Sequence, residues 1–168
     1  MRPKEQPIIL DLPFTSQDLA LEAAAIGGLL LSIGMLILFW SQLPASVPTH
    51  FGVSGDVDGW GDKRTLLIFP SVSLILYVML TIVNWYPHKF NYPWPITAQN
   101  ARDQYQLARS LLAWLKVETI MLFAFLEWTT IRTALGQVNG LGVIFLPFVL
   151  VIIFGTVGIY FYNAYRAR

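Results

Sequence analysis

Two long apolar segments on either side of an irregular loop constrain this chain most strongly. Ala23 to Trp40 and Leu66 to Trp85 contain no charged residue. Each approaches the ~20 apolar residues that cross a bilayer as an α-helix. The loop between them, residues 43–63, is rich in Gly, Pro and Asp, which interrupt regular structure. The sequence therefore predicts an integral membrane protein, with any recognition surface in this loop.

The composition supports a membrane protein and excludes several other classes. The chain of 168 residues is 55% hydrophobic and 12% charged, whereas soluble domains are typically about 25% charged. A net charge of +1 gives no electrostatic footprint for nucleic acid. The absence of cysteine rules out disulfides, thiolate catalysis and cysteine-based metal sites.

The hydropathy pattern predicts an all-α membrane protein, namely a bundle of four transmembrane helices over residues 19–43, 63–86, 109–135 and 141–165. Residues 19–168 are expected to form one domain after an extended, proline-containing segment, 1–18. A compact Gly/Pro/Asp-rich outer loop (44–62) joins the first two helices, and an aromatic and proline-rich loop (87–108) precedes the third. Pro70 and Pro147 are expected to kink the second and fourth helices.

The positions of the basic residues predict the orientation. Seven Lys and Arg residues lie at the termini and in the second loop, against three on the other side. Those seven are Arg2, Lys4, Lys89, Arg102, Arg109, Arg166 and Arg168. Cytoplasmic segments carry such an excess. We therefore expect a multi-pass protein of a bacterial-type cytoplasmic membrane with both termini in the cytoplasm, an internal membrane being the alternative.

The first helix carries small residues at four-residue spacing, at Ala20, Ala24, Gly28 and Ser32. Such a face lets another helix backbone approach closely. We expect it to pack within the chain, with a homodimer face as the alternative.

The third helix contains three intramembrane charges, Lys116, Glu118 and Glu127. A charged side chain costs about 2.5 to 3.5 kcal/mol at a bilayer centre. We expect all three to lie away from the centre, and each to need a partner. We expect Lys116 to snorkel to the cytoplasmic surface and Glu118 to hydrogen-bond Asn84 or a tyrosine of the fourth helix. We expect Glu127 to join this helix to the 43–63 loop through Lys63, Arg64 or His50. A proton-relay role for Glu127 is the alternative.

The loop residues carry a family resemblance. Leu43, Pro44, Val47–Phe51, Gly55, Asp58–Gly61 and Lys63 resemble the signature of a bacterial membrane family of unknown function found at the N-terminal end of SdpI-type immunity proteins. A second segment, Phe90 to Lys116, resembles the polar segment and third helix of short, stand-alone members of that group. The resemblance implies a helical membrane protein. It also implies a role in protecting the producing cell from a secreted antimicrobial toxin and in relaying that signal to a repressor.

The candidate recognition residues all lie in this loop. They are Pro48, His50, Phe51, Gly55, Asp56, Asp58, Gly59, Trp60 and Lys63. His50 is expected to hydrogen-bond a nearby Asp or carbonyl, with metal or proton chemistry as the alternative. Trp60 is expected to anchor at the membrane interface.

Three loop carboxylates raise the question of a metal. Asp56, Asp58 and Asp62 are hard oxygen ligands on a glycine-containing turn and are candidates for Ca²⁺. The spacing lacks a full calcium loop, so we prefer turn-forming and capping roles, with Asp62 capping the second helix. We expect no metal and no cofactor.

No catalytic motif is present in the sequence, so we expect a protein that is not an enzyme. Two functions remain. The first is an envelope protein whose loop senses or neutralises an extracellular peptide or lipid. The second is a small accessory subunit or assembly factor of a larger membrane complex. Under both functions the protein is expected to contact the lipid bilayer. Its further partner is expected to be an extracellular peptide in the first case and other membrane subunits in the second.

Overall fold

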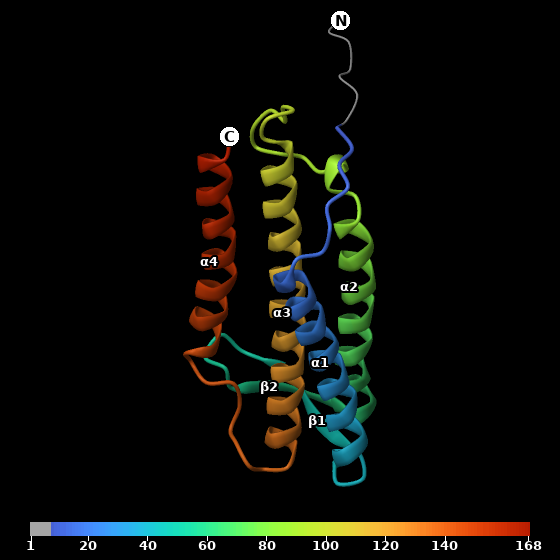
Figure 1. The fold of residues 1–168 in the computed structure, drawn as a ribbon. Helices are drawn as coiled ribbons and strands as arrows, with labels where there is room; N and C mark the ends of the chain where they lie inside the picture. Colours follow the sequence, from blue (N-terminus) through green and yellow to red (C-terminus); the bar gives the residue numbers. More distant parts are fainter. Residues whose placement is uncertain (1–7) are drawn as a thin grey trace, which may run out of the picture.

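The computed structural model describes residues 8–168, and any prediction for residues 1–7 lies outside the described residues. The chain forms four long helices and one small sheet: α1 (Ser16–Phe39), β1 (Ser46–Phe51), β2 (Val57–Asp62), α2 (Ile68–Asn84), α3 (Ala101–Ala134) and α4 (Phe145–Arg166). Two short 3₁₀ helices, η1 (Lys63–Leu67) and η2 (Pro87–Lys89), flank α2. The C-terminus and the α2–α3 loop lie at one end of the molecule, and the hairpin of β1 and β2 lies at the other (Figure 1).

Among the described residues, three helices are long and apolar enough to cross a membrane: Ser16–Phe39, Lys63–Asn84 and Phe145–Arg166. The structure is therefore mostly helical, as predicted, and its apolar helices suggest a membrane protein. The all-α prediction is wrong at residues 46–62, which form a two-stranded antiparallel sheet. A bundle of four spanning helices stays a prediction, because α3 is not among the three.

The most charged of the long helices is at the centre of the fold. α3 packs against α1, α2 and α4, and in Figure 1 it runs between α4 and α2, with α1 crossing in front. Its 34 residues make a rod about 50 Å long. A helix that carries buried charge is stable in an apolar environment only when neighbouring helices supply partners, so its central position explains its sequence.

The core consists of two clusters along α3. Ala25, Leu29 and Ile120 form the first, between α1 and α3. The second surrounds the hairpin end of the bundle and contains Met35, Leu36, Leu43, Val47, Leu66, Ala124 and Ile131. Val47 of β1 is fully buried in it. The sheet is therefore anchored in the helical core.

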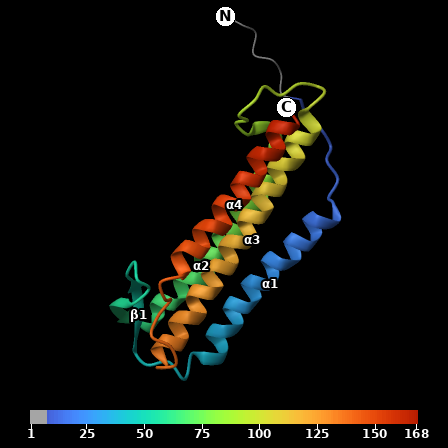
Figure 2. The same ribbon diagram turned by 90° about the vertical axis from the view of Figure 1, so that its left-hand side faces the viewer.

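The small-residue face of α1 packs within the chain, as predicted, but with a different set of residues. Gly28 and Ser32 are buried against α3, while Ala20 is exposed and Ala24 is half-buried. Ala25 completes the buried stripe. In Figure 2, α1 diverges from the other helices toward its N-terminal end, and Ala20, near that end, is exposed.

Helix starts are set by local capping. Thr15 and Asp18 form a reciprocal capping box at α1. Pro70 and Pro147 are each the third residue of their α-helix, because α2 begins at Ile68 and α4 at Phe145. In the first turn an amide has no intrahelical acceptor. The expected interior kinks are therefore wrong: these prolines lie at helix starts.

Candidate functional site

The hairpin of β1 and β2 presents most of the predicted recognition residues. Its register pairs Val47 with Gly61, Pro48 with Trp60 and His50 with Gly59, with irregularities between Pro48 and Phe51. A Cβ on Gly61 would lie 2.9 Å from the Thr49 side chain, and one on Gly59 would lie 3.0 Å from the His50 Cβ. The glycines of β2 thus make room for the side chains of β1, and this close approach explains why a Gly-rich sequence forms a strand here.

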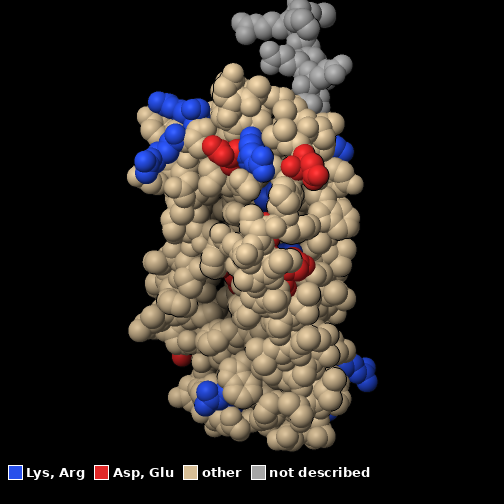
Figure 3. Space-filling model, viewed as in Figure 1, with Lys and Arg blue, Asp and Glu red and all other residues tan. Residues whose placement is uncertain are grey.

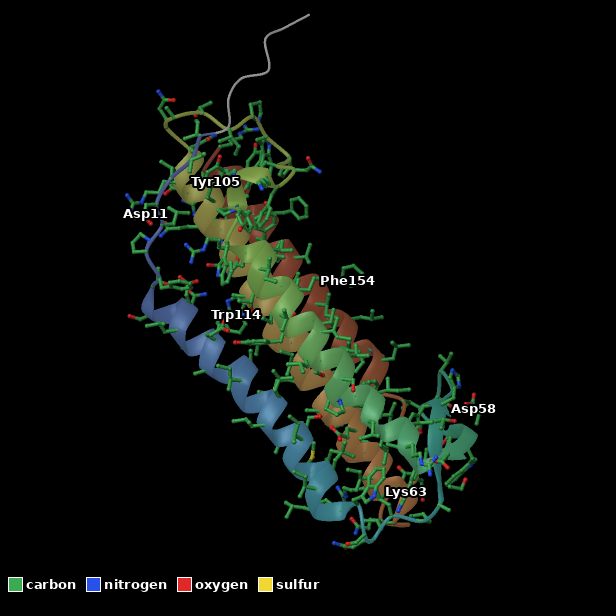
Figure 4. The ribbon with its side chains drawn as sticks, turned by 90° about the vertical axis from the view of Figure 1, so that its right-hand side faces the viewer. Asp11, Asp58, Lys63, Tyr105, Trp114 and Phe154 are labelled. Carbon is green, nitrogen blue, oxygen red and sulfur yellow. The ribbon has the colours of Figure 1, made fainter. Side chains whose placement is uncertain are left out.

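The predicted residues divide by exposure. His50, Asp56, Asp58 and Trp60 are exposed; Phe51, Gly59 and Lys63 are half-buried; Pro48 and Gly55 are buried. Trp60 is 58% exposed, and Val53, which sequence reasoning did not single out, is 86% exposed at the turn. Figure 4 places Asp58 on the hairpin away from the helices and Lys63 nearer to them. The outward surface therefore combines apolar and polar side chains.

His50 and Asp58 form a pair across the hairpin. His50 Nδ1 lies 2.5 Å from Asp58 Oδ1, and both side chains are largely exposed. The expected hydrogen bond from His50 to a nearby Asp is confirmed. Exposed pairs of this kind contribute about 0–1 kcal/mol, so the pair fixes local geometry more than it stabilises the fold.

The three loop carboxylates have separate partners. Asp56 accepts a hydrogen bond from Ser54 Oγ at 2.7 Å, and Asp62 accepts one from the Arg64 amide at 2.8 Å. Asp62 caps η1, as predicted for the start of the second helix. Within residues 8–168, no group of three or more His, Cys, Asp or Glu side chains could hold a metal ion. The Ca²⁺ candidates therefore do not converge.

Lys63 faces the bundle. Its Nζ donates to the Trp40 carbonyl at 3.3 Å and lies 4.9 Å from the centre of the Trp40 ring. This links the base of the hairpin to the end of α1. Lys63 is therefore a fastening residue of the hairpin.

A second fastening comes from the α3–α4 connection, which sequence reasoning missed. The Leu141 amide donates to the Gly55 carbonyl at 2.8 Å. The backbones of Asp56 and Gly140 also pair as an isolated antiparallel β-bridge. Gly55 has φ +84° and Gly140 has φ +148°, backbone angles that favour glycine. Gly140 and Gly142, which lie against Gly55, were the sequence signal for this contact. The hairpin is held at both its base and its turn.

Gly55→Ala is expected to release the hairpin turn from the α3–α4 connection. A Cβ at Gly55 would lie 2.5 Å from the Gly142 amide nitrogen, a backbone atom that cannot step aside. Hydrogen exchange at the Leu141 amide should accelerate, because its acceptor is the Gly55 carbonyl. Gly136→Ala is the matched control: it has φ +70° but no neighbour within 4 Å, so it adds about 1–2 kcal/mol of strain without displacing the hairpin. Equal hydrogen-exchange protection of the Leu141 amide in the two variants would contradict the expected release of the hairpin turn.

Lys116 of α3 is buried in a cluster that joins three helices. Its Nζ lies 2.5 Å from Glu22 Oε2 of α1 and 3.0 Å from Thr81 Oγ1 of α2. Tyr77 of α2 donates to the same glutamate, and its ring lies under the ammonium group. Lys116 is 2% exposed, so the prediction that it snorkels to the surface is wrong. The physical reason is a closer carboxylate, Glu22, in the first helix.

The two glutamates of α3 also have other partners than expected. Thr156 of α4 donates to Glu118, and Ser32 of α1 donates to Glu127. Glu127 is 0% exposed, so the proposed link from Glu127 to the hairpin loop is wrong. Thr156 lies near the middle of α4, one of the candidate spans. Glu118 therefore lies beside the middle of this candidate span.

The α2–α3 connection folds over the end of the bundle opposite the hairpin. Tyr92 donates to the Pro87 carbonyl at 2.9 Å and packs beside Tyr105, with ring centres 5.5 Å apart. Burial, with smaller contributions from Tyr160 and Tyr105, raises the pKa of Tyr92 above its ordinary range, so the hydroxyl stays a donor. Thr97 and Asn100 hydrogen-bond each other, and α3 begins at Ala101. Asn100 is the N-cap residue of α3, which starts eight residues before the predicted third helix and shortens the predicted loop 87–108.

Comparisons with known proteins give a family similarity for the part of the chain that contains the hairpin. Residues 27–74 match the family described as "Domain of unknown function (DUF1648)". The chain is also 40% identical over 76 residues to an "Uncharacterized protein" of Archaeoglobus fulgidus. That match covers 38% of this chain and 42% of the archaeal protein. No solved structure matches the chain. The segment from the second half of α1 through the hairpin to the start of α2 is thus similar to a domain family of unknown function.

Proposed function

We propose that this chain is a non-enzymatic membrane protein in which the hairpin, residues 46–62, recognises an extracellular peptide or lipid. The observation that carries the proposal is a small sheet fastened at its base by Lys63 and at its turn by Gly55, with Trp60 and Val53 left exposed. A preorganised surface loses little conformational freedom on binding. The family similarity adds support for the hairpin as the functional region, because the matched residues 27–74 include the whole hairpin.

The charge distribution supports an outward-facing hairpin. Lys89, Arg102, Arg109, Arg166 and Arg168 lie at the opposite end, whereas Lys63, Arg64 and Arg132 lie near the hairpin. Figure 3 shows Lys and Arg side chains mainly toward the two ends, with a mostly uncharged surface between them that is interrupted by a few acidic atoms at mid-height. Because cytoplasmic segments carry an excess of Lys and Arg, this distribution supports an arrangement with the C-terminal end in the cytoplasm.

Photo-crosslinking from two matched positions tests this function. A photoreactive amino acid at Val53 reports on the hairpin turn, and one at Phe154, an exposed residue of α4 that points away from the bundle (Figure 4), reports on the lipid-facing surface. We expect mass spectrometry to find a peptide or lipid adduct from Val53 that Phe154 does not form. Adducts from Phe154 alone would overturn the hairpin proposal.

The second candidate is a small accessory subunit of a larger membrane complex. One observation favours it: within the described residues α4 packs mainly on α3, and no residue in its most apolar stretch is buried. A stoichiometric protein adduct at Phe154, together with comigration in a native gel, would support this candidate.

Protection against a secreted antimicrobial toxin is the finer form of the first proposal and rests on the resemblance to SdpI-type proteins. If the hairpin neutralises such a toxin, cells that make the protein should survive challenge and cells with Trp60→Ala should not. If cells that make the wild-type protein survive no better than cells without it, the immunity role is excluded. The recognition role is then tested by the crosslinking experiment alone.

A further inference from the structure

A groove runs along the seam between α3 and α4, and Glu118 lies in the middle of it. Toward the hairpin is the phenylalanine cavity, about 550 Å³, which includes Phe125, Phe145 and Phe148 in its walls. Toward the opposite end is the tyrosine cavity, about 510 Å³, which includes Trp114 and Tyr160. Both cavities are lined by Glu118. Figure 3 shows this face of the molecule hollowed beside α4.

The groove continues to the polar end of the molecule. A third cavity, about 570 Å³, contains Asp18, Asp103 and Arg109 and shares Gln17, Leu107, Ser110 and Asn163 with the tyrosine cavity. Trp114 lies where α1 diverges from the other helices (Figure 4), which leaves this part of the seam uncovered. A ligand can therefore reach Glu118 from the polar end without crossing the packed core.

Glu118 is the uncompensated charge of this groove. One of its oxygens accepts the hydrogen bond from Thr156, and the other, Oε2, is buried without a hydrogen-bond partner within residues 8–168. The nearby Lys116 pairs with Glu22 and Thr81 on α1 and α2. No described Lys, Arg or His forms an ion pair with Glu118. A carboxylate in apolar surroundings favours a ligand that brings the opposite charge.

The walls beside Glu118 fit the apolar part of a cation. Phe125 and Phe145 stack with ring centres 5.5 Å apart, and Phe148 lies in the same cavity. Aromatic faces attract a cation within about 6 Å of their centres. Aliphatic side chains, among them Met121, Leu122 and Ile152, complete the surface. Both cavities have the size of small-molecule sites, which typically occupy about 300–1,000 Å³.

We propose that the α3–α4 groove binds a hydrophobic organic cation, with its charged centre beside Glu118 and its apolar substituents in the phenylalanine and tyrosine cavities. Charge complementarity selects this occupant over a neutral lipid chain, which would leave the carboxylate uncompensated. The site is separate from the hairpin and does not depend on the recognition role proposed for it.

Binding of tetraphenylphosphonium to the full-length protein in detergent tests the proposal by equilibrium dialysis. The wild type should bind the ion saturably, and Glu118→Gln should weaken binding at least tenfold. The glutamine keeps an acceptor for Thr156, so the α3–α4 contact persists. Phe148→Ala provides a second variant, since this exposed side chain lines the groove without supporting the core. It should weaken binding severalfold.

Two controls separate a cation site from a merely apolar one. Glu127→Gln changes a buried carboxylate of the same helix that lies outside these cavities, and it should leave binding unchanged. Tetraphenylborate has the same shape and the opposite charge, and it should not compete. Equal binding of both ions, or binding that is unchanged in Glu118→Gln, would overturn the proposal. So would a copurifying phospholipid that tetraphenylphosphonium fails to displace in native mass spectrometry.

Discussion

Lys116→Met is expected to lower the free energy of unfolding by about 3 kcal/mol. Removing one partner of a buried ion pair costs about 3–5 kcal/mol because the other charge is left uncompensated. Here the remaining group is Glu22, whose side chain is 33% exposed, so the lower end of that range applies. Tyr77 still donates to Glu22 and recovers part of the loss. Reversible unfolding of the detergent-solubilised protein, followed by tryptophan fluorescence, measures the difference.

The double variant Glu22→Gln, Lys116→Met is the control for Lys116→Met. With both charges removed, the cluster retains a neutral amide that can hydrogen-bond Tyr77, and most of the lost stability should return. The coupling between the two positions then measures the interaction of the pair. A double variant as unstable as the sum of the single variants would mean that the two side chains act independently.

Gly28→Ile is expected to destabilise the contact between α1 and α3 by about 1–3 kcal/mol, the usual cost of overpacking a core. A Cβ at Gly28 would lie 2.8 Å from Ile120 Cγ2 and 3.4 Å from Met121 Sδ. Ile120 is almost completely buried, so it cannot move aside without disturbing the core cluster with Ala25 and Leu29. The thermal unfolding midpoint of the extracted protein should fall accordingly.

Gly27→Ile provides a control one residue away. A Cβ at Gly27 meets no atom within 4 Å, while the change in helix propensity is the same in both variants. Its unfolding midpoint should stay at or above that of the wild type. A similar fall in both variants would show that loss of glycine, and not crowding against α3, determines the effect.

The positions of the helices could be predicted from sequence because hydropathy is a local property. The predicted segments 19–43, 63–86 and 141–165 overlap α1, η1 with α2, and α4, with differences of a few residues at most ends. Capping chemistry accounts for part of the differences: Thr15 starts α1 earlier than expected. The hairpin was missed because its glycines, which indicate a loop in isolation, are required by close contacts with the facing strand.

The partners of the α3 charges could not be predicted for a different reason. Helix periodicity gives the face on which a side chain lies but not which neighbour covers that face. Lys116 and Glu118 are two residues apart and point to different neighbours, Glu22 of α1 and Thr156 of α4. Assigning them requires the order of helices around α3, which the sequence pattern does not contain. The groove at Glu118 depends on the same arrangement and was equally invisible.

The central place of α3 also bears on how the protein is made. Synthesis proceeds from the N-terminus, so α1 and α2 leave the ribosome before α3. The partners of Lys116 and Glu127, namely Glu22, Thr81 and Ser32, therefore already exist when those charges emerge. Glu118 alone must wait for Thr156 of the last helix. In the proposed membrane arrangement, the first two segments therefore supply partners for Lys116 and Glu127 as the third segment emerges, and the contact at Glu118 completes the bundle last.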